Sequence, residues 1–234
     1  RTLIPLVAAL CLAPVALAAP EAEDRRVENL AAFTRLAGYI QHFHPSDQSY
    51  DADWARIMRT GAVAVMDAPG PAELAAALGA VLRPLAPSLQ VFAADAPPEP
   101  PEPLLANAGM PLVGVAYWKH EGFALDFQDR VFGRSRVLVS LRDGRRLREA
   151  PDPTVFHDFD LGAGVACHMA LSVWVGDDNR TRPLPGPSRE LTALGVLAPE
   201  ALDAFVPVAL VWNAIQHFSP AFDLAPATMD VEWI

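Results

Sequence analysis

The sequence is short of cysteine, lysine and local runs of charge. Its 234 residues include two cysteines, Cys11 and Cys167, and Lys119 is the only lysine among 18 basic residues. Only 20% of the residues are charged, and the formal net charge of −10 comes without a basic stripe. This balance argues against nucleic acid as a partner. The cysteine count excludes a scaffold held together by several disulfides.

The amino-terminal residues form an apolar run that follows Arg1 and ends in Ala16-Leu17-Ala18. This pattern is typical of a secretory signal peptide, here residues 1–18. A membrane anchor is the alternative, but Pro5 and Pro14 interrupt the run, and it is shorter than the roughly 20 residues that span a bilayer. We therefore expect an exported protein, periplasmic or extracellular, that has no membrane contact after cleavage and keeps a single thiol.

The two ends of the chain suggest a part of a longer protein. The chain begins with Arg1 and not with methionine, and it stops at Ile234, directly after a tryptophan, where an amphipathic pattern is starting. Apolar residues make up 52% of the sequence, which is enough for one large or two small hydrophobic cores. We expect at least one further segment beyond Ile234.

The first half of the chain predicts a small helical unit over residues 23–87. Apolar side chains recur at three-to-four spacing from residue 23 to residue 44, which is typical of an amphipathic helix, and Pro45 ends it. Two more helices are predicted over about 52–66 and 71–85.

The middle of the chain predicts a β-rich accessory domain over residues 88–180. Residues 96–103 (APPEPPEP) are too rich in proline for a helix or a strand and predict an extended linker. Short β-prone runs follow at 112–118, 136–141 and 165–175, separated by glycine and aspartate turns.

The last part of the chain, residues 188–234, predicts the start of a helical bundle. A second proline-rich linker covers 182–187, and helices are predicted over about 188–194, 199–205 and 208–218. The predicted fold class is therefore α+β: a small helical unit, then a β-rich accessory unit, then helices that open a truncated bundle.

Two hexapeptides in the chain differ at only one position. Residues 40–45 spell IQHFHP and residues 215–220 spell IQHFSP, so that His42 and His217 are 175 positions apart. Each histidine falls in the last turn of a predicted helix, where it can interact with the exposed carbonyl groups, and the neighbouring phenylalanine would pack into a core. We interpret both histidines as structural. An acidic residue and a tryptophan follow each copy, namely Asp53-Trp54 and Glu232-Trp233.

Residues 118–122 (WKHEG) are the densest group of functional side chains. On a strand, Trp118 and His120 share one face, so they are candidate ligand contacts; the plain alternative is a strand end with one solvated face. Metal binding by His42 and His44 is disfavoured, because residues two apart on a helix point in different directions.

The chain lacks the sequence patterns of a complete enzyme. It has no Gly-x-Ser-x-Gly and no Ser-x-x-Lys motif. Gly162 and Gly164 lack the third glycine of a dinucleotide loop and predict a tight turn between strands. Cys167 and His168 are adjacent on a predicted strand and face opposite ways, which disfavours a thiolate–imidazolium pair. We assign no catalytic, cofactor-binding or metal-binding residue.

Four stretches, taken in order, resemble the amino-terminal part of bacterial exported serine peptidases of the C-terminal-processing, tricorn-like family. Each motif is weak alone, but the four together cover nearly all of the chain after the signal peptide. They are residues 29–54 (with Gly38-Tyr39, Phe43-His44-Pro45-Ser46-Asp47 and Asp53-Trp54), 117–122 (YWxHxG), 160–165 (DLGxGV) and 211–233 (with VWNxxQHFxP and Glu232-Trp233).

The resemblance implies a pre-catalytic accessory region. The serine nucleophile, its lysine or histidine base and the core that cuts a peptide or protein substrate would lie downstream, so the 234 residues alone are expected to be inactive. No family catalytic residue can be carried onto a position here. The alternative is a non-enzymatic secreted module that binds a peptide or a glycan through Trp118 and His120. A secreted scaffold without a ligand is a third hypothesis.

Overall fold

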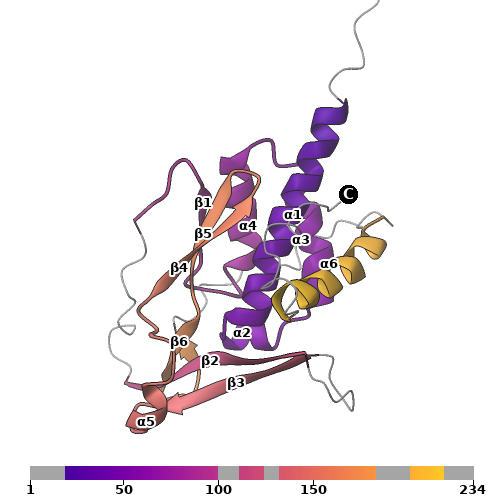
Figure 1. Cartoon of the computed structure of the whole chain (residues 1–234). Coiled ribbons are helices and arrows are strands. Elements are labelled where there is room, and N and C mark those ends of the chain that lie inside the picture. Colours follow the sequence, from indigo (N-terminus) through magenta and orange to yellow (C-terminus); the bar gives the residue numbers. More distant parts are fainter. Residues whose placement is uncertain (1–18, 100–110, 124–131, 183–200, 219–234) are drawn as a thin grey trace, which may run out of the picture.

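The computed structural model has the predicted α+β class, with helices and two antiparallel sheets (Figure 1). The predicted signal peptide, the predicted helix over 188–194 and the Glu232-Trp233 pair lie outside the residues that the structure describes. In the described part of the chain, no helix is both long and apolar enough to cross a membrane. The structure describes residues 19–99, 111–123, 132–182 and 201–218.

The three helices predicted for the first half of the chain are confirmed. They are α1 (Ala19–Phe43), α3 (Trp54–Val65) and α4 (Pro71–Leu82), and a short helix, α2 (Asp47–Tyr50), precedes α3. Local capping explains where α2 and α3 begin. The Ser46 side chain accepts from the backbone N–H of Ser49, and the Asp53 side chain accepts from that of Arg56.

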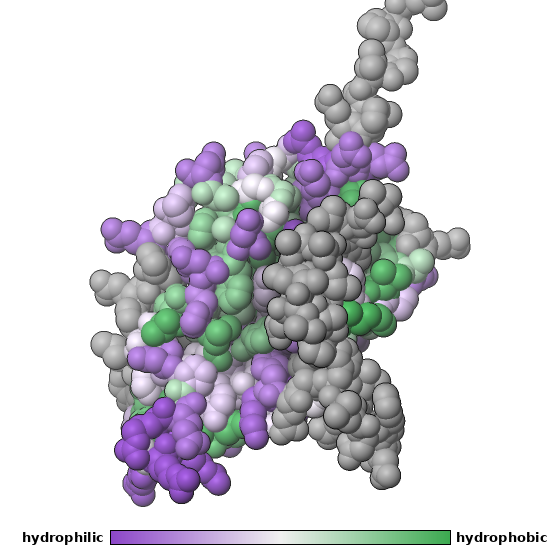
Figure 2. Space-filling view, in the orientation of Figure 1, coloured by the Kyte–Doolittle hydropathy of each residue, from purple (hydrophilic) through white to green (hydrophobic). Residues whose placement is uncertain are grey.

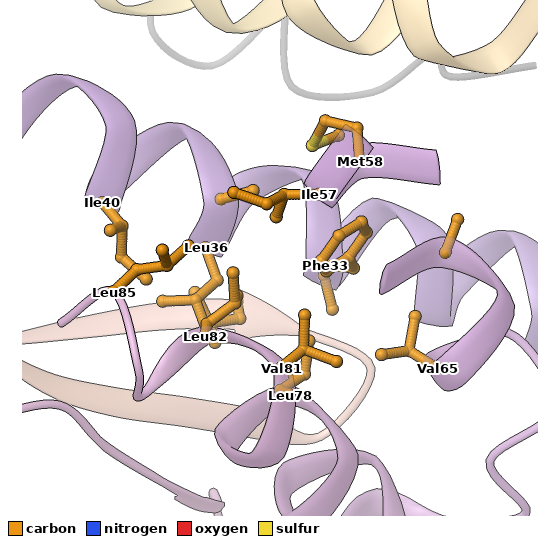
Figure 3. Packing of buried hydrophobic residues seen from close by; sticks show 14 of the residues in the cluster. Phe33, Leu36, Ile40, Ile57, Met58, Val65, Leu78, Val81, Leu82 and Leu85 are labelled. Carbon is orange, nitrogen blue, oxygen red and sulfur yellow. The ribbon is translucent and has the colours of Figure 1, made fainter. Parts of the chain in front are cut away.

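Helices α1 and α3 run antiparallel and hold the main core (Figure 3). Asn29, in the first half of α1, donates to the carbonyl of Val65 at the end of α3. Further along α1, the Phe33 ring lies so close to Gly61 of α3 that a β-carbon there would overlap it. Glycine at position 61 therefore permits the close approach of the two helices.

Among the described residues, seven strands form two separate sheets, and all of their pairings are antiparallel. The three-stranded sheet has the order β1-β5-β4, and the four-stranded sheet has the order β3-β2-β6-β7. A short helix, α5 (Gly144–Leu147), follows β3. The strands are β1 (Gln90–Ala93), β2 (Leu112–Phe123), β3 (Phe132–Ser140), β4 (Phe156–Gly162), β5 (Val165–Ala170), β6 (Ser172–Gly176) and β7 (Thr181–Arg182).

The three-stranded sheet belongs to the helical core. Leu161 and Met169, from β4 and β5, are fully buried together with the apolar faces of α1, α3 and α4. The tight turn predicted between these strands is confirmed, with positive φ angles from residue 162 to residue 164. The main core therefore extends across the boundary predicted after residue 87. The run 165–175, predicted as one β-prone segment, contributes to two strands in different sheets.

The four-stranded sheet has only a small core of its own, formed by Ala116, Val173 and Val175. It lies against the end of α1 and does not cover the apolar faces of the helices (Figure 1). Contacts other than a shared apolar core must therefore attach this sheet to the helices.

The last described helix, α6 (Ala201–Phe218), corrects the predicted break between residues 205 and 208. The helix continues through Pro207, whose ring is exposed to solvent. A proline inside a helix removes one backbone hydrogen bond, but Leu202 and Val206 before it and Ala209 and Asn213 after it bury their side chains. This burial holds both sides of Pro207 in one helix.

Candidate functional site at the carboxyl end of helix α1

The carboxyl end of α1 carries backbone carbonyl groups that need donors from outside the helix. Pro45 cannot continue the helix, and the chain turns into α2 there. Four donors come from one face of strands β2 and β3, where Trp118 pairs with Arg136 and His120 pairs with Arg134. We call these four side chains the donor face.

Each side chain of the donor face reaches a different carbonyl group near the end of α1. Together they satisfy four carbonyl groups in a row of five residues, which fixes the sheet against the helix end. Arg134 Nη1 donates to Gln41 O, His120 Nε2 to His42 O (2.7 Å), Trp118 Nε1 to His44 O (3.2 Å) and Arg136 Nε to Pro45 O (2.8 Å).

The two candidate ligand contacts, Trp118 and His120, therefore direct their ring nitrogens at α1. Arg134 also lies over the Trp118 ring, with its guanidinium carbon 4.5 Å from the ring centroid. Phe43 packs on the His120 ring at 4.6 Å between centroids. The rings of Trp118 and His120 thus both contact other residues of this protein.

Asp47 continues this attachment beyond the helix end. One of its carboxylate oxygens pairs with Arg136 at 2.5 Å, and the other accepts from the backbone N–H of Thr181 at 2.9 Å. The Thr181 hydroxyl accepts in return from the backbone N–H of Asp47 at 3.0 Å. One aspartate therefore connects α2 to both β3 and β7.

The two IQHF copies meet at this site. The His217 ring lies against Tyr39, His42 and Phe43, with centroid distances of 5.2, 5.6 and 5.0 Å. One turn earlier on α6, Asn213 is fully buried and donates to the backbone carbonyl of Thr34 at 3.1 Å. We call His42, His120, His217 and Arg134 the histidine cluster.

The surroundings of the histidine cluster favour the neutral form of its imidazole rings. Burial, with the charge of Arg134 nearby, lowers the pKa of His42 from 6.5 to about 2, and burial lowers that of His217 to about 4. Burial also lowers the pKa of Arg134. His42 Nδ1 lies 2.9 Å from Arg134 Nη1, which has only hydrogens to offer, so His42 accepts there and carries its own proton on Nε2.

The arrangement does not suit a metal ion. Among the described residues, no group of three or more histidine, cysteine, aspartate or glutamate side chains could hold one. His42 and His44 point apart: His42 faces Arg134 and His217, whereas His44, just after the last residue of α1, faces Ser88.

The hydrogen bond between the buried side chains of Ser88 and His44 has the wrong direction for a catalytic dyad. Their side chains are 3.2 Å apart, and His44 Nδ1 accepts from the backbone N–H of Ser46. The ring proton is therefore on Nε2, which donates to the serine, whereas a general base must accept the serine proton there. Burial lowers the pKa of His44 to about 3, and both side chains are closed to solvent.

His168 belongs to a second candidate pair. It pairs with a carboxylate but has no hydroxyl partner among the described residues. Its Nδ1 lies 2.5 Å from Asp158, and its Nε2 faces the carbonyl of Pro98 at 3.3 Å. The neighbouring Cys167 is in the core, where burial raises its thiol pKa to about 12. Neither residue forms part of a nucleophile–base pair.

Two surface hollows of about 360 Å³ each lie at the other end of α1, on either side of Arg25. Asp67 and Pro69 line one of them, and Gly70 and Pro71 line the other. Neither hollow is lined by the donor face, so they add nothing to the site at the carboxyl end of α1.

The sequence singled out Trp118, His120 and both IQHF copies, but it indicated no role for Arg134 and Arg136, and Asp47 was noted only as part of one resemblance stretch. The two arginines alternate along a β-prone run, and this alternation is the signal for a polar strand face. Their pairing with Trp118 and His120 depends on the strand register, which the sequence did not reveal. No family model, no curated protein and no solved structure matches the chain.

Proposed function

We propose that the chain is the pre-catalytic accessory region of an exported serine peptidase of the C-terminal-processing, tricorn-like family, acting in the periplasm or outside the cell. The observation that supports this is spatial. The first of the four stretches that carry the resemblance contains most of α1, and the described residues of the other three, far apart in the sequence, contact this helix. Sequence motifs that stabilise one fold are expected to contact one another, because each motif supplies one side of a contact that another motif completes.

The contacts that join the stretches are specific. The second stretch supplies Trp118 and His120 to the end of α1. The third is reached by Arg35 of α1, whose Nη1 donates to the carbonyl of Leu161 at 2.9 Å. The fourth supplies Asn213 and His217, which contact the same helix. Helix α1, which belongs to the first stretch, is thus contacted by the other three.

In this proposal the role of the chain is to hold and orient, and not to react. The donor face, Asp47 and the histidine cluster form a joint that fixes the four-stranded sheet relative to the helices. The serine–histidine and aspartate–histidine pairs among the described residues lack the polarity or the hydroxyl of a catalytic pair. The nucleophile and the binding site for the peptide or protein substrate belong to the rest of the proposed peptidase.

Labelling with a fluorophosphonate, which reacts with activated serines, tests the proposal. The 234-residue chain and the protein encoded by the complete reading frame would be labelled side by side and mapped by mass spectrometry. We expect a labelled serine after Ile234 in the longer protein, together with peptide hydrolysis, and no label within the 234 residues. A labelled serine inside the chain, or a reading frame that ends at Ile234, would contradict the proposal.

A secreted peptide- or glycan-binding module is the alternative. It requires Trp118 and His120 as ligand contacts, but Trp118 Nε1 and His120 Nε2 already donate to carbonyl groups at the carboxyl end of α1, so a ligand would have to use other parts of the two rings. Binding of a peptide or glycan array to the chain, abolished by Trp118→Ala with the fold retained, would favour this alternative.

A further inference from the structure

Strand β3 forms an outer edge of the four-stranded sheet, and β2 is its only strand partner among the described residues (Figure 1). The ladder between them includes the bond from the Leu141 N–H to the Val113 carbonyl. Hydrogen-bonded and non-bonded pairs alternate in an antiparallel ladder, so residues 135, 137 and 139 bond to β2, and the residues between them direct their backbone groups outward. We call the outward N–H and C=O groups of Arg134, Arg136 and Leu138 the open edge.

The other three sheet edges are better protected than β3. Strands β1 and β7 have only four and two residues. Strand β4 is held by α1, where Arg35 donates to the carbonyl of Leu161. Strand β3 has nine residues, and no described residue bonds to its open edge. The Leu138 side chain, in the middle of this edge, is 50% exposed. A long unpaired edge is a ready template for a strand of another chain.

The region around this edge is basic, although the chain has a net charge of −10. Residues 132–149 contain six arginines and two acidic residues. The outward carbonyl of Ser140 accepts from the Asp143 N–H at 2.9 Å, so α5 begins on the outer side of the edge. Figure 2 shows hydrophilic residues gathered over α5. Three arginines there are exposed and have no carboxylate partner among the described residues. We call Arg142, Arg145 and Arg148 the arginine corner.

We propose that the open edge and the arginine corner bind an acidic, extended peptide segment of another protein, which adds to β3 as an additional strand. Backbone hydrogen bonds to the open edge would hold any extended chain. The arginine corner selects acidic ones, because guanidinium and carboxylate groups form charge-assisted hydrogen bonds. This proposal rests on the edge of one sheet and does not depend on the peptidase proposal.

The position of the arginine corner also sets the direction of the peptide. All strand pairings among the described residues are antiparallel, and the corner follows the carboxyl end of β3. A peptide that adds antiparallel to β3 brings its amino-terminal residues to the corner. The acidic residues of the bound peptide therefore precede its strand-forming residues.

Fluorescence anisotropy with labelled synthetic peptides tests the proposal. The probe is a run of glutamates followed by alternating valine and threonine residues, and the control peptide has the glutamates at the other end. We expect the probe to bind the chain severalfold more tightly than the control peptide. Leu138→Pro removes an outward N–H but no bond to β2, so the far-UV circular dichroism spectrum should be unchanged. This variant should bind the probe about tenfold more weakly.

Charge reversal tests the corner separately, and it suffices if Leu138→Pro does not fold. Arg145→Glu combined with Arg148→Glu should weaken binding of the probe about tenfold. Arg56→Glu, the same change at an exposed position on α3, should leave binding unchanged. Equal weakening by the corner variant and by Arg56→Glu would overturn the proposal, as would equal binding of the two peptides.

Two further outcomes would assign the edge to another partner and so overturn the proposal. Binding to phosphatidylglycerol vesicles, lost in the corner variant and without binding of the probe, would mean that the corner meets a membrane surface. A dimer in analytical ultracentrifugation that Leu138→Pro dissociates would mean that a second copy of the chain pairs with the open edge.

Discussion

The two sheets of this protein are attached to the same helices in different ways. The three-stranded sheet shares the main core, where Leu161, Val165 and Met169 are fully buried. The four-stranded sheet has a small core of its own and meets α1 through the donor face and Asp47. Apolar burial has little dependence on geometry or protonation, whereas hydrogen bonds depend on both. The second sheet should therefore be the more easily released of the two.

The largest effect is expected from the shared core. Leu161→Ala should lower the free energy of unfolding by about 3–4 kcal/mol, because it leaves a cavity between the three-stranded sheet and α1. The control is Leu138→Ala in the four-stranded sheet, a side chain that is 50% exposed, with a change within about 0.5 kcal/mol. Urea denaturation measures both, and equal losses would contradict the assignment of the core.

The next effect concerns the attachment of the four-stranded sheet. Asp47→Ala removes the partner of Arg136 and of the Thr181 N–H, and should cost about 2 kcal/mol. Asp67→Ala is the matched control, because Asp67 pairs with Arg26 on the exposed surface, where such a pair contributes less than about 0.5 kcal/mol. If the two variants lose the same stability by urea denaturation, Asp47 does not hold the sheet.

Acid should weaken the joint at the end of α1. In the folded protein the pKa values of His42, His44 and His217 are about 2, 3 and 4, below the ordinary 6.5. The unfolded chain therefore takes up protons first, and the free energy of unfolding should fall as the pH drops below about 6.5. This loss should continue until the pH approaches the folded-state values.

His42→Gln tests this pH dependence, since glutamine can still accept from Arg134 but does not titrate. Between pH 6.5 and 5.5 the variant should lose about 1 kcal/mol less than the parent protein, which is the share of one buried histidine. Urea denaturation across this range gives both slopes. Parallel pH profiles would mean that His42 is protonated in the folded state.

The smallest effect is expected from a single hydrogen bond of the donor face. Trp118→Phe keeps most of the ring but removes the bond from Nε1 to His44 O, which should cost about 0.5–1 kcal/mol. Trp174→Phe is the matched control on β6, because none of the described residues accepts a hydrogen bond from that ring. Thermal unfolding compares the two, and a larger loss at position 174 would reverse the assignment.

The sequence was sufficient for the elements of the fold but not for their assembly. The apolar spacing between residues 23 and 85 predicts three helices, since it follows local rules. The break expected at Pro207 was wrong, because burial of Val206 before it and Ala209 after it outweighs the one hydrogen bond lost there. The division of 165–175 between two sheets could not be foreseen, because both strands are mostly apolar and no glycine or proline separates them.

The site itself was only half predictable. Trp118 and His120 share a face on any strand, so their grouping follows from residue types alone. Their target, the carbonyl groups that follow Ile40, lies more than 70 residues away in the sequence. The meeting of His42 and His217 depends on how α6 crosses α1, and Asn213 directs this crossing through its bond to Thr34. Such contacts exist only in the assembled fold.

Native-state hydrogen exchange tests the contrast between the two sheets most directly. Amide protection of Ala116 in β2 and Cys167 in β5 would be compared in the parent protein and in Asp47→Ala. We predict that the variant loses far more protection at Ala116 than at Cys167, because the four-stranded sheet opens while the main core stays closed. Equal losses at the two positions would mean that both sheets open together, and would contradict separate attachment.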